Sequence, residues 1–298
     1  MRAGRTIGAM LLILLGLVSG VGADAAGLKA EGVVAIVGKT SLYRIEIVCR
    51  KGIERAYGNT GTNNGAVLVA LINDAIECEV SSLNGVTVSP AEISEFSRYV
   101  DENTKAPEIL EEIKKVFGIY RVSYERLYLR PRMINRKLHA FYSRSTEIHK
   151  KERALIERAY RLVHGGMPFA KAAEKLGLKA SVIEVEDKEH AVADALQKYM
   201  PKPEVGMKDP LIAILETLPA GELHRYIIES DADYRVIRLA GKKDKTYLVE
   251  AIAAAKRPFD DWFREQAGKI KISIRDPELL AGIKKTYPEL WWMKGLGN

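Results

Sequence analysis

The chain has 298 residues and a formal net charge of +7, from 46 Lys and Arg against 39 Asp and Glu. Because basic and acidic residues alternate closely, as in the segment Glu111–Lys115, this charge is typical of solvated helix faces and predicts no nucleic-acid partner. After the N-terminal segment, no stretch reaches the roughly 20 apolar residues of a bilayer span, which excludes a stable membrane span in the rest of the chain.

The N-terminus has the order of features typical of a secretory signal peptide. Arg2 and Arg5 precede an apolar stretch over residues 7–18, and small residues follow over 20–26. We predict a signal peptide over residues 1–25, with cleavage near Ala23–Ala26, and therefore an exported, periplasmic protein. The alternative is an uncleaved N-terminal membrane anchor, which the short apolar stretch disfavours.

Two cysteines, Cys49 and Cys78, follow the predicted signal peptide. In an oxidising compartment such a pair favours a disulfide, and a bridge closing a loop of about 30 residues would stabilise the fold by roughly 3 kcal/mol. Two buried free thiols are the alternative. The chain has no Cys-x-x-Cys motif, so thiol redox chemistry is not expected.

The first half of the chain is predicted to be almost entirely helical. Val33–Val37 is a short β-branched run that predicts a buried strand. Apolar spacing predicts helices over 42–51 and 66–83, the second ended by Asn84 and Gly85. The segment Ser89–Glu92 combines a Ser cap, a Pro at the first helical position and a Glu that completes a capping box, so a helix begins there.

Helical spacing continues to Gly165. We expect a helix over 107–117 and another that is capped by Ser123, is kinked at Pro131 and continues through Phe141. Helix then resumes and ends at Gly165 and Gly166.

The pattern changes to mixed α and β after Gly166. The alternation of Ile270, Ile272 and Ile274 with polar residues predicts a half-buried strand, which we expect to pair with Val33–Val37. The remaining predicted elements are helices over 169–176, 210–218 and 247–255 and after Pro258, strands over 180–185 and 234–239, and a turn at 219–222.

No catalytic set is evident in the sequence. The five His residues include no pair with the spacing of a helical zinc site, and no nucleophile elbow or P-loop is present. Asp260 and Asp261 stand in the first turn of a predicted helix, where the helix dipole favours acids. We therefore predict no catalytic residue, no metal and no cofactor.

Several short motifs, in the right order, resemble two related families. Leu162–Ala173 resembles the parvulin pattern in which a helix ends at Gly before Phe-Ala-x-x-Ala. Leu218–Leu223 resembles the turn Leu-x-x-Gly-Glu-Leu of that family, and Tyr234–Leu239 resembles its last strand. Val34–Gly38 and the helices around Leu71 and Ser89–Ile93 resemble the N-terminal lobe of SurA-type periplasmic chaperones.

The resemblance implies an α+β, mostly helical fold. It implies a helical chaperone lobe, a small and eroded parvulin-like α+β domain, and a C-terminal strand that returns to the first lobe. The implied division is a signal peptide over 1–25, a chaperone lobe over 30–150, a parvulin-like domain over 151–245, a C-terminal segment over 246–280 and a tail over 281–298.

The parvulin-like positions depart from the family pattern. Arg235 stands where the family has a His on its last strand, and Asp233 replaces the preceding Gly. The first strand of the family is not found in residues 138–164, which look helical. Phe169, Tyr234 and Arg235 are therefore interpreted as degenerate parvulin positions, and the domain is expected to lack catalysis.

The function implied by the resemblance is that of a holdase for unfolded exported polypeptides, outer-membrane proteins being one candidate class. The net positive charge would favour acidic clients, although no single segment of the sequence indicates that role. An active prolyl isomerase and an envelope scaffold protein are the alternatives. Aromatic residues of the helical lobe, either core or client-binding, are the candidate contacts, and Tyr120, Tyr124 and Tyr128 would share one helix face: Phe96, Tyr99, Tyr120, Tyr124, Tyr128, Phe141 and Tyr142.

Overall fold

The computed structural model describes residues 32–103, 121–186 and 210–295, together with Glu108, Leu110, Glu111 and Lys114. The predicted signal peptide, most of the helix predicted over 107–117, and Tyr120 lie outside the described residues. The fold is α+β with two small sheets, as expected at this level. Within the described ranges, none of the helices combines the length and the apolar composition that crossing a membrane requires.

A three-stranded antiparallel sheet joins the two ends of the described chain. Its order is β2 (Thr40–Tyr43), β1 (Val33–Val37) and β7 (Ile272–Ile274). In the β1–β7 pair, Val37 lies opposite Ile272 and Ala35 opposite Ile274, which is the pairing predicted from the sequence. β1 is therefore the central strand, with one neighbour local in sequence and the other from the far end of the chain.

The β1–β2 connection depends on Gly38. This residue has a φ of 56°, in the left-handed region that favours glycine. A Cβ at this position would lie 2.8 Å from the carboxyl group of Glu79. Oε1 of Glu79 accepts hydrogen bonds from the backbone N–H of Lys39 at 3.0 Å and from Oγ1 of Thr40 at 2.9 Å. The turn is thus fixed to the helix beneath it.

Three helices follow, each begun by a local signal. α2 (Arg44–Ala56) begins two residues later than predicted, because Leu42 belongs to β2. α3 (Asn64–Leu83) is capped by Asn63, whose Oδ1 accepts a hydrogen bond from the backbone N–H of Ala66 at 2.8 Å. α4 (Pro90–Asn103) begins with the predicted capping box, in which Ser89 N donates to Glu92 at 2.8 Å and Glu92 N donates to Ser89 Oγ at 3.2 Å.

The next helix contains a π-helical turn. α6 (Arg121–Tyr124), the π-helical η1 (Glu125–Leu129) and α7 (Arg130–Arg144) are continuous, so Ser123 lies inside α6 and the prediction that it caps the helix was wrong. The irregularity precedes Pro131, which has no N–H to donate to the carbonyl of Leu127. That carbonyl instead accepts a hydrogen bond from Nη1 of Arg50 on α2.

The C-terminal elements complete the core of this lobe. α12 (Phe259–Ala267) begins after Pro258, as predicted, and is followed by β7, α13 (Pro277–Thr286) and η2 (Trp291–Gly295). Ile283 of α13 is fully buried against the core that includes α3. Trp292 is also buried, and its Nε1 donates to Oδ1 of Asn73 on α3 at 3.0 Å.

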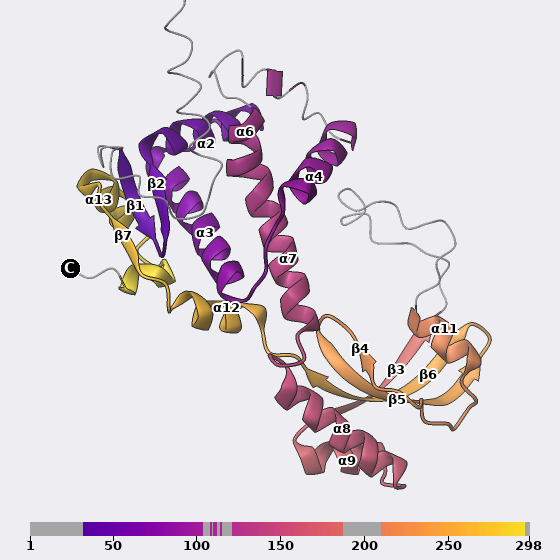
Figure 1. Ribbon diagram of the computed structural model, residues 1–298. Coiled ribbons are helices and arrows are strands. Elements are labelled where there is room, and N and C mark those ends of the chain that lie inside the picture. The colour runs from indigo at the N-terminus through magenta and orange to yellow at the C-terminus, as the bar shows by residue number, and fades with distance from the viewer. Residues whose placement is uncertain are drawn as a thin grey trace, which may run out of the picture.

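The second sheet lies at the opposite end of the molecule, and α7 runs from the first lobe toward it (Figure 1). Its antiparallel order is β3 (Lys179–Glu186), β6 (Thr246–Ala255), β5 (Asp233–Lys243) and β4 (Ile228–Glu229). α8 (Lys150–His164) and α9 (Phe169–Leu176) cover one face, and α11 (Pro210–Thr217) lies over the other (Figure 1). Alternate residues of β5 and β6 supply the two cores, as expected for a strand buried on both faces.

The helix predicted over 247–255 was wrong, because these residues form β6. Tyr247, Val249 and Ala251 face α11, while Ile252 and Ala254 face α8 and α9. The run of alanines at 253–255 favours a helix by intrinsic propensity. As the central partner of both β3 and β5, however, the segment gains two ladders of hydrogen bonds and burial on both faces, which outweigh that preference.

The predicted disulfide is not present, since Cys49 and Cys78 are free thiols. Cys49 on α2 packs against the main core of the first lobe, whereas Cys78 on α3 packs against a separate cluster of Val88, Ile93 and Ile134. The two side chains thus belong to different contact clusters. Burial raises the pKa of the Cys78 thiol to about 12, so this residue behaves as a small apolar group.

Candidate functional site

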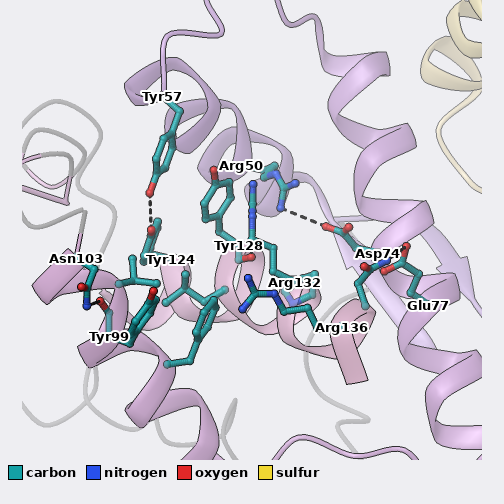
Figure 2. Close-up of a pocket in the computed structure, with 15 residues that line it drawn as sticks. Arg50, Tyr57, Asp74, Glu77, Tyr99, Asn103, Tyr124, Tyr128, Arg132 and Arg136 are labelled. Atoms are coloured by element: carbon teal, nitrogen blue, oxygen red, sulfur yellow. Dashed lines mark hydrogen bonds and ion pairs between the residues drawn. The ribbon is translucent and has the colours of Figure 1, made fainter. Parts of the chain in front are cut away.

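A cavity of about 750 Å³ lies between the helices of the first lobe. Figure 2 shows its walls, to which α2, α3, α4, η1 and α7 all contribute side chains. Four of the aromatic residues proposed from the sequence line it, and the lining consists of Arg50, Tyr57, Asp74, Glu77, Phe96, Tyr99, Val100, Asn103, Tyr124, Tyr128, Leu129, Pro131, Arg132, Asn135 and Arg136. The structure therefore brings Phe96, Tyr99, Tyr124 and Tyr128 together at one place.

Stacked tyrosines form one wall of this cavity. The ring of Tyr128 stacks on Tyr57 at 4.8 Å and on Tyr124 at 5.3 Å, measured between centroids. The hydroxyls of Tyr57 and Tyr124 share a hydrogen bond of 2.5 Å. Tyr124 and Tyr128 do lie side by side as predicted, but both are buried, whereas Tyr99 on α4 is 36% exposed. The helix stripe is thus a fixed wall, and the exposed aromatic surface comes from α4.

Guanidinium groups lie against these rings. The guanidinium carbon of Arg132 is 3.4 Å from the centroid of Tyr128, and that of Arg50 is 5.3 Å from the same centroid. Arg136 lies 5.5 Å from the centroid of Phe96. Such contacts are favourable cation–π interactions. These arginines and Tyr57 were not among the predicted site residues, although α7 has five Lys and Arg residues and no acidic residue.

Two carboxylates of α3 complete the cavity. Burial raises the pKa of Glu77 to about 7. The negative charge of Asp74 also raises this pKa, whereas a hydrogen bond of 3.1 Å from Nδ2 of Asn135 lowers it. Burial also raises the pKa of Asp74. The positive charge of Arg50, whose Nη1 is 3.2 Å from Oδ2 of Asp74, opposes this increase. Glu77 therefore exchanges its proton near neutral pH, inside an aromatic cavity.

Glu77→Gln should stabilise the fold at pH 8 but not at pH 4.5. A carboxyl whose folded-state pKa lies above its unfolded value destabilises the fold when it is charged, so the penalty is absent below about pH 4.5 and complete above about pH 7. Discounted for partial exposure, we expect a gain of about 1–2 kcal/mol at pH 8 and none at pH 4.5. Urea denaturation at both pH values measures this, and equal gains at both would contradict the assignment.

The remaining predicted client-binding residues lie elsewhere. Phe141 packs against Trp262 of α12, with centroids 6.3 Å apart, and is part of the core rather than of the cavity. Tyr142 lines a second cavity of about 850 Å³. This cavity lies between the C-terminal half of α7, the β4–β5 turn and the segment before α12, and it is lined by Asn135, Arg136, His139, Ala140, Tyr142, Ser143, Arg144, Asp231, Ala232, Lys256, Arg257, Pro258 and Phe259.

The positions compared with parvulins do not line either cavity. Phe169 and Tyr234 are buried in the core between α8, α9 and the second sheet. Arg235 forms an ion pair with Asp233, in which Nη2 and Oδ2 are 2.7 Å apart. Neither the 750 Å³ cavity nor the 850 Å³ cavity has any of these three residues in its lining.

Comparison with known proteins finds a distant structural likeness. No family model matches the sequence, and no curated protein matches it. A solved structure from work on PEB4 and Cj1289, described as structurally related SurA-like chaperones of Campylobacter jejuni, matches over 82% of this chain and 100% of its own, with 13% sequence identity and a TM-score of 0.26. At this identity and TM-score, the function has to be argued from the residues of this chain.

Proposed function

We propose that this chain is an exported chaperone that holds unfolded or partly folded envelope proteins without catalysing prolyl isomerisation. The observation that carries the proposal is the aromatic cavity of the first lobe, where Phe96, Tyr99, Tyr124 and Tyr128 converge from two separate helical segments. The proposal includes the periplasmic location, the signal peptide over 1–25 and the division of the chain given above.

The chemistry of this cavity suits reversible contact with varied sequences. Aromatic rings offer apolar area with little conformational entropy to lose, and arginine stems adapt to different neighbours. A holding protein needs such a surface to be open and tolerant rather than closely complementary to one ligand. Tyr99 and Phe96 on α4 supply its more accessible part, over the stacked wall of Tyr57, Tyr124 and Tyr128.

The second lobe favours a holding role over catalysis. An isomerase must lower a barrier of about 18–20 kcal/mol, which calls for a dry pocket around the proline ring and polar groups aimed at a twisted amide. Phe169 and Tyr234 serve as core residues, and Arg235 is paired with Asp233. An active parvulin-type isomerase is the alternative, carried by the resemblance of Leu162–Ala173 and Tyr234–Leu239 to that family.

Phe96→Ala combined with Tyr99→Ala should weaken aggregation suppression severalfold. Both side chains line the cavity and are only partly buried, so their loss should remove contact area while the stacked tyrosine wall remains. The measurement is light scattering of several unrelated unfolded proteins at increasing ratios of the purified protein. A matched control, Leu83→Ala with Tyr226→Ala, removes comparable exposed apolar area outside the cavity and should act like the unchanged protein.

The same protein is tested on a short proline peptide for cis–trans exchange. Acceleration above the spontaneous rate would establish the isomerase alternative. Suppression that is unaffected by the Phe96 and Tyr99 changes would place client binding elsewhere. Absence of both activities, with capture of a single envelope partner, would identify a scaffold protein instead.

A further inference from the structure

The strand β7 is an open edge of the first sheet. Of the strands that the structure describes, β1 alone pairs with it. Gly38 N donates to the carbonyl of Lys271 at 2.9 Å, which directs that carbonyl toward β1. Backbone groups alternate in direction along an antiparallel strand, so the N–H and C=O groups of Ile272 and Ile274 point away from β1. No backbone group of the described chain bonds to these two donors and two acceptors.

A basic depression of about 380 Å³ borders this edge. Arg264 of α12, Lys269 and Lys271 line it, together with Ile272 of β7 and Trp291 of η2. The described part of the chain contributes no carboxylate to its lining. We call this depression the β7 pocket.

The three cations of the β7 pocket are exposed and not neutralised. Among the described residues, Arg264, Lys269 and Lys271 have no carboxylate within ion-pair distance. Nζ of Lys269 donates to Oε1 of Gln266 at 3.0 Å, which is a neutral acceptor. All three basic side chains are exposed to solvent.

Negative groups at the end of α12 already have partners. Glu265, which follows Arg264 in the sequence, pairs with Arg257 at 2.9 Å. The carbonyl groups of residues 264, 266 and 267 accept backbone hydrogen bonds from residues 268–270. The β7 pocket therefore keeps an uncompensated positive charge beside an unpaired strand edge.

We propose that the β7 edge and its pocket bind an extended, acidic polypeptide segment as an additional antiparallel strand. Over residues 269–275, exposed side chains alternate with half-buried ones, so Lys269 and Lys271 share the exposed face. Carboxylates two residues apart in the segment would lie opposite these lysines. This surface goes beyond the proposed holding function, because it is separate from the aromatic cavity and either could exist without the other.

A polypeptide fits this edge better than a phosphate group or a lipid headgroup. A phosphate accepts hydrogen bonds, so it would leave the C=O groups of Ile272 and Ile274 without a partner. An extended chain offers N–H and C=O groups at the same spacing and satisfies both kinds. The backbone thus selects an extended chain, and the cations select its acidic side chains.

A second copy of this chain is a poor occupant on charge grounds. Antiparallel pairing of two β7 edges about Ser273 would place Lys271 of each copy opposite Arg275 of the other. Like charges directly opposite each other destabilise a strand pair. An acidic segment puts the opposite charge at the same positions.

The first test compares two fluorescent peptides of about eight residues, one alternating Glu with Thr and the other with Gln in place of every Glu. Two or three exposed ion pairs, each worth about a factor of two, predict roughly fivefold tighter binding of the Glu peptide at low salt. This preference should fall below about twofold at about 0.5 M salt, because the pairs are screened. Fluorescence anisotropy with the full protein measures both affinities.

Backbone methylation tests strand addition itself. A Glu opposite Lys271 turns its own N–H away from β7, whereas the Thr residues between the acids donate to β7. Methylating every Thr nitrogen of the Glu peptide should therefore weaken binding by at least about tenfold, through the loss of two hydrogen bonds. Methylating every Glu nitrogen adds as many methyl groups and should change the affinity by less than about twofold.

The combined variant Arg264→Gln, Lys269→Gln and Lys271→Gln should bind the Glu and Gln peptides equally. It should still distinguish the two methylated peptides, because the strand edge is unchanged. If this variant loses its circular dichroism signal, Lys271→Gln alone should halve the preference for the Glu peptide.

Two control proteins keep the β7 pocket intact. Lys151→Gln, Arg158→Gln and Lys171→Gln remove the same charge from exposed positions of α8 and α9 and should keep the preference for the Glu peptide. The Phe96→Ala, Tyr99→Ala protein should bind the Glu peptide like the unchanged protein, since both residues line the other cavity.

Equal binding of the Glu and Gln peptides by the unchanged protein, or equal effects of the two methylation patterns, would overturn this proposal and leave the holding function intact. Tighter binding of phosphatidylglycerol vesicles than of the Glu peptide, lost in the glutamine variant, would overturn it in favour of a lipid surface. A dimer that the Glu peptide dissociates would identify a second copy as the occupant instead. Absence of aggregation suppression, with both peptide comparisons as expected, would overturn the proposed function and support this surface.

Discussion

Removal of residues 269–298 should abolish the cooperative folding of the N-terminal helices. The truncation takes away β7, which pairs with β1, together with α13 and η2, which pack on α3. It exposes the core surface that Ile283 and Trp292 cover and leaves the β1 edge unpaired. We expect lower helical circular dichroism and no sharp urea transition in the first lobe, because the truncation removes one strand of its sheet and two side chains buried in its core, and native domains are only marginally stable.

Point variants separate packing from truncation. Ile283→Ala and Trp292→Ala should each cost about 2–5 kcal/mol, since both side chains are almost fully buried and a cavity remains after each change. Trp292→Ala also leaves Oδ1 of Asn73 without its donor. Glu289→Ala, at an exposed position between them, should change the urea midpoint little. A truncated protein with unchanged helical signal and transition would show that the lobe does not need its C-terminal strand.

Arg50→Met should destabilise the first lobe by about 3–5 kcal/mol. This buried guanidinium pairs with Glu54 at 2.8 Å and with Asp74 at 3.2 Å, and it donates to the Leu127 carbonyl that Pro131 leaves without a partner. Its removal leaves two carboxylates and a carbonyl without that donor, which costs more than the pair itself is worth. Urea denaturation at neutral pH measures the loss.

The loss at Arg50 should depend on pH in a defined direction. Burial raises the pKa of Asp74 and Arg50 opposes that increase, so the Met variant should have a still higher pKa at Asp74. A carboxyl with a raised folded-state pKa is penalised when charged, and the penalty disappears toward the unfolded value of about 3.9. The deficit should therefore be largest at pH 8 and shrink on acidification. The control Arg55→Met, exposed on the same helix, should stay within about 0.5 kcal/mol, and a pH-independent deficit would contradict this account.

Elements with local signals were predictable from the sequence. The capping box at Ser89, Pro258 before α12 and Gly177 after α9, with its φ of 65°, each fix a helix end through neighbours in the chain. The pairing of β7 with β1 was also predictable, because Ile270, Ile272 and Ile274 alternate with polar residues and so needed one buried partner.

Features created by distant contacts were not predictable. β6 contains a run of alanines that favours a helix alone, and only its two flanking strands make it a strand. Within the π-helical turn, the carbonyl of Leu127 accepts a hydrogen bond from Arg50, which reaches it from another helix. Tyr57 joined the candidate site only because α2 lies beside η1, while Phe141, on the expected helix, points into the core instead.

The central position of β1 has a consequence for how this protein is made. Its neighbour β7 lies near the other end of the chain, so the sheet of the first lobe is complete only after nearly the whole polypeptide is present. β5 and β6, by contrast, are adjacent in sequence and need only short-range closure. During vectorial synthesis or export, helices α2, α3, α4 and α7 therefore keep apolar surface exposed until the last residues of the chain emerge. The protein that we propose to hold unfolded or partly folded chains thus itself passes, while it folds, through a state with exposed apolar surface.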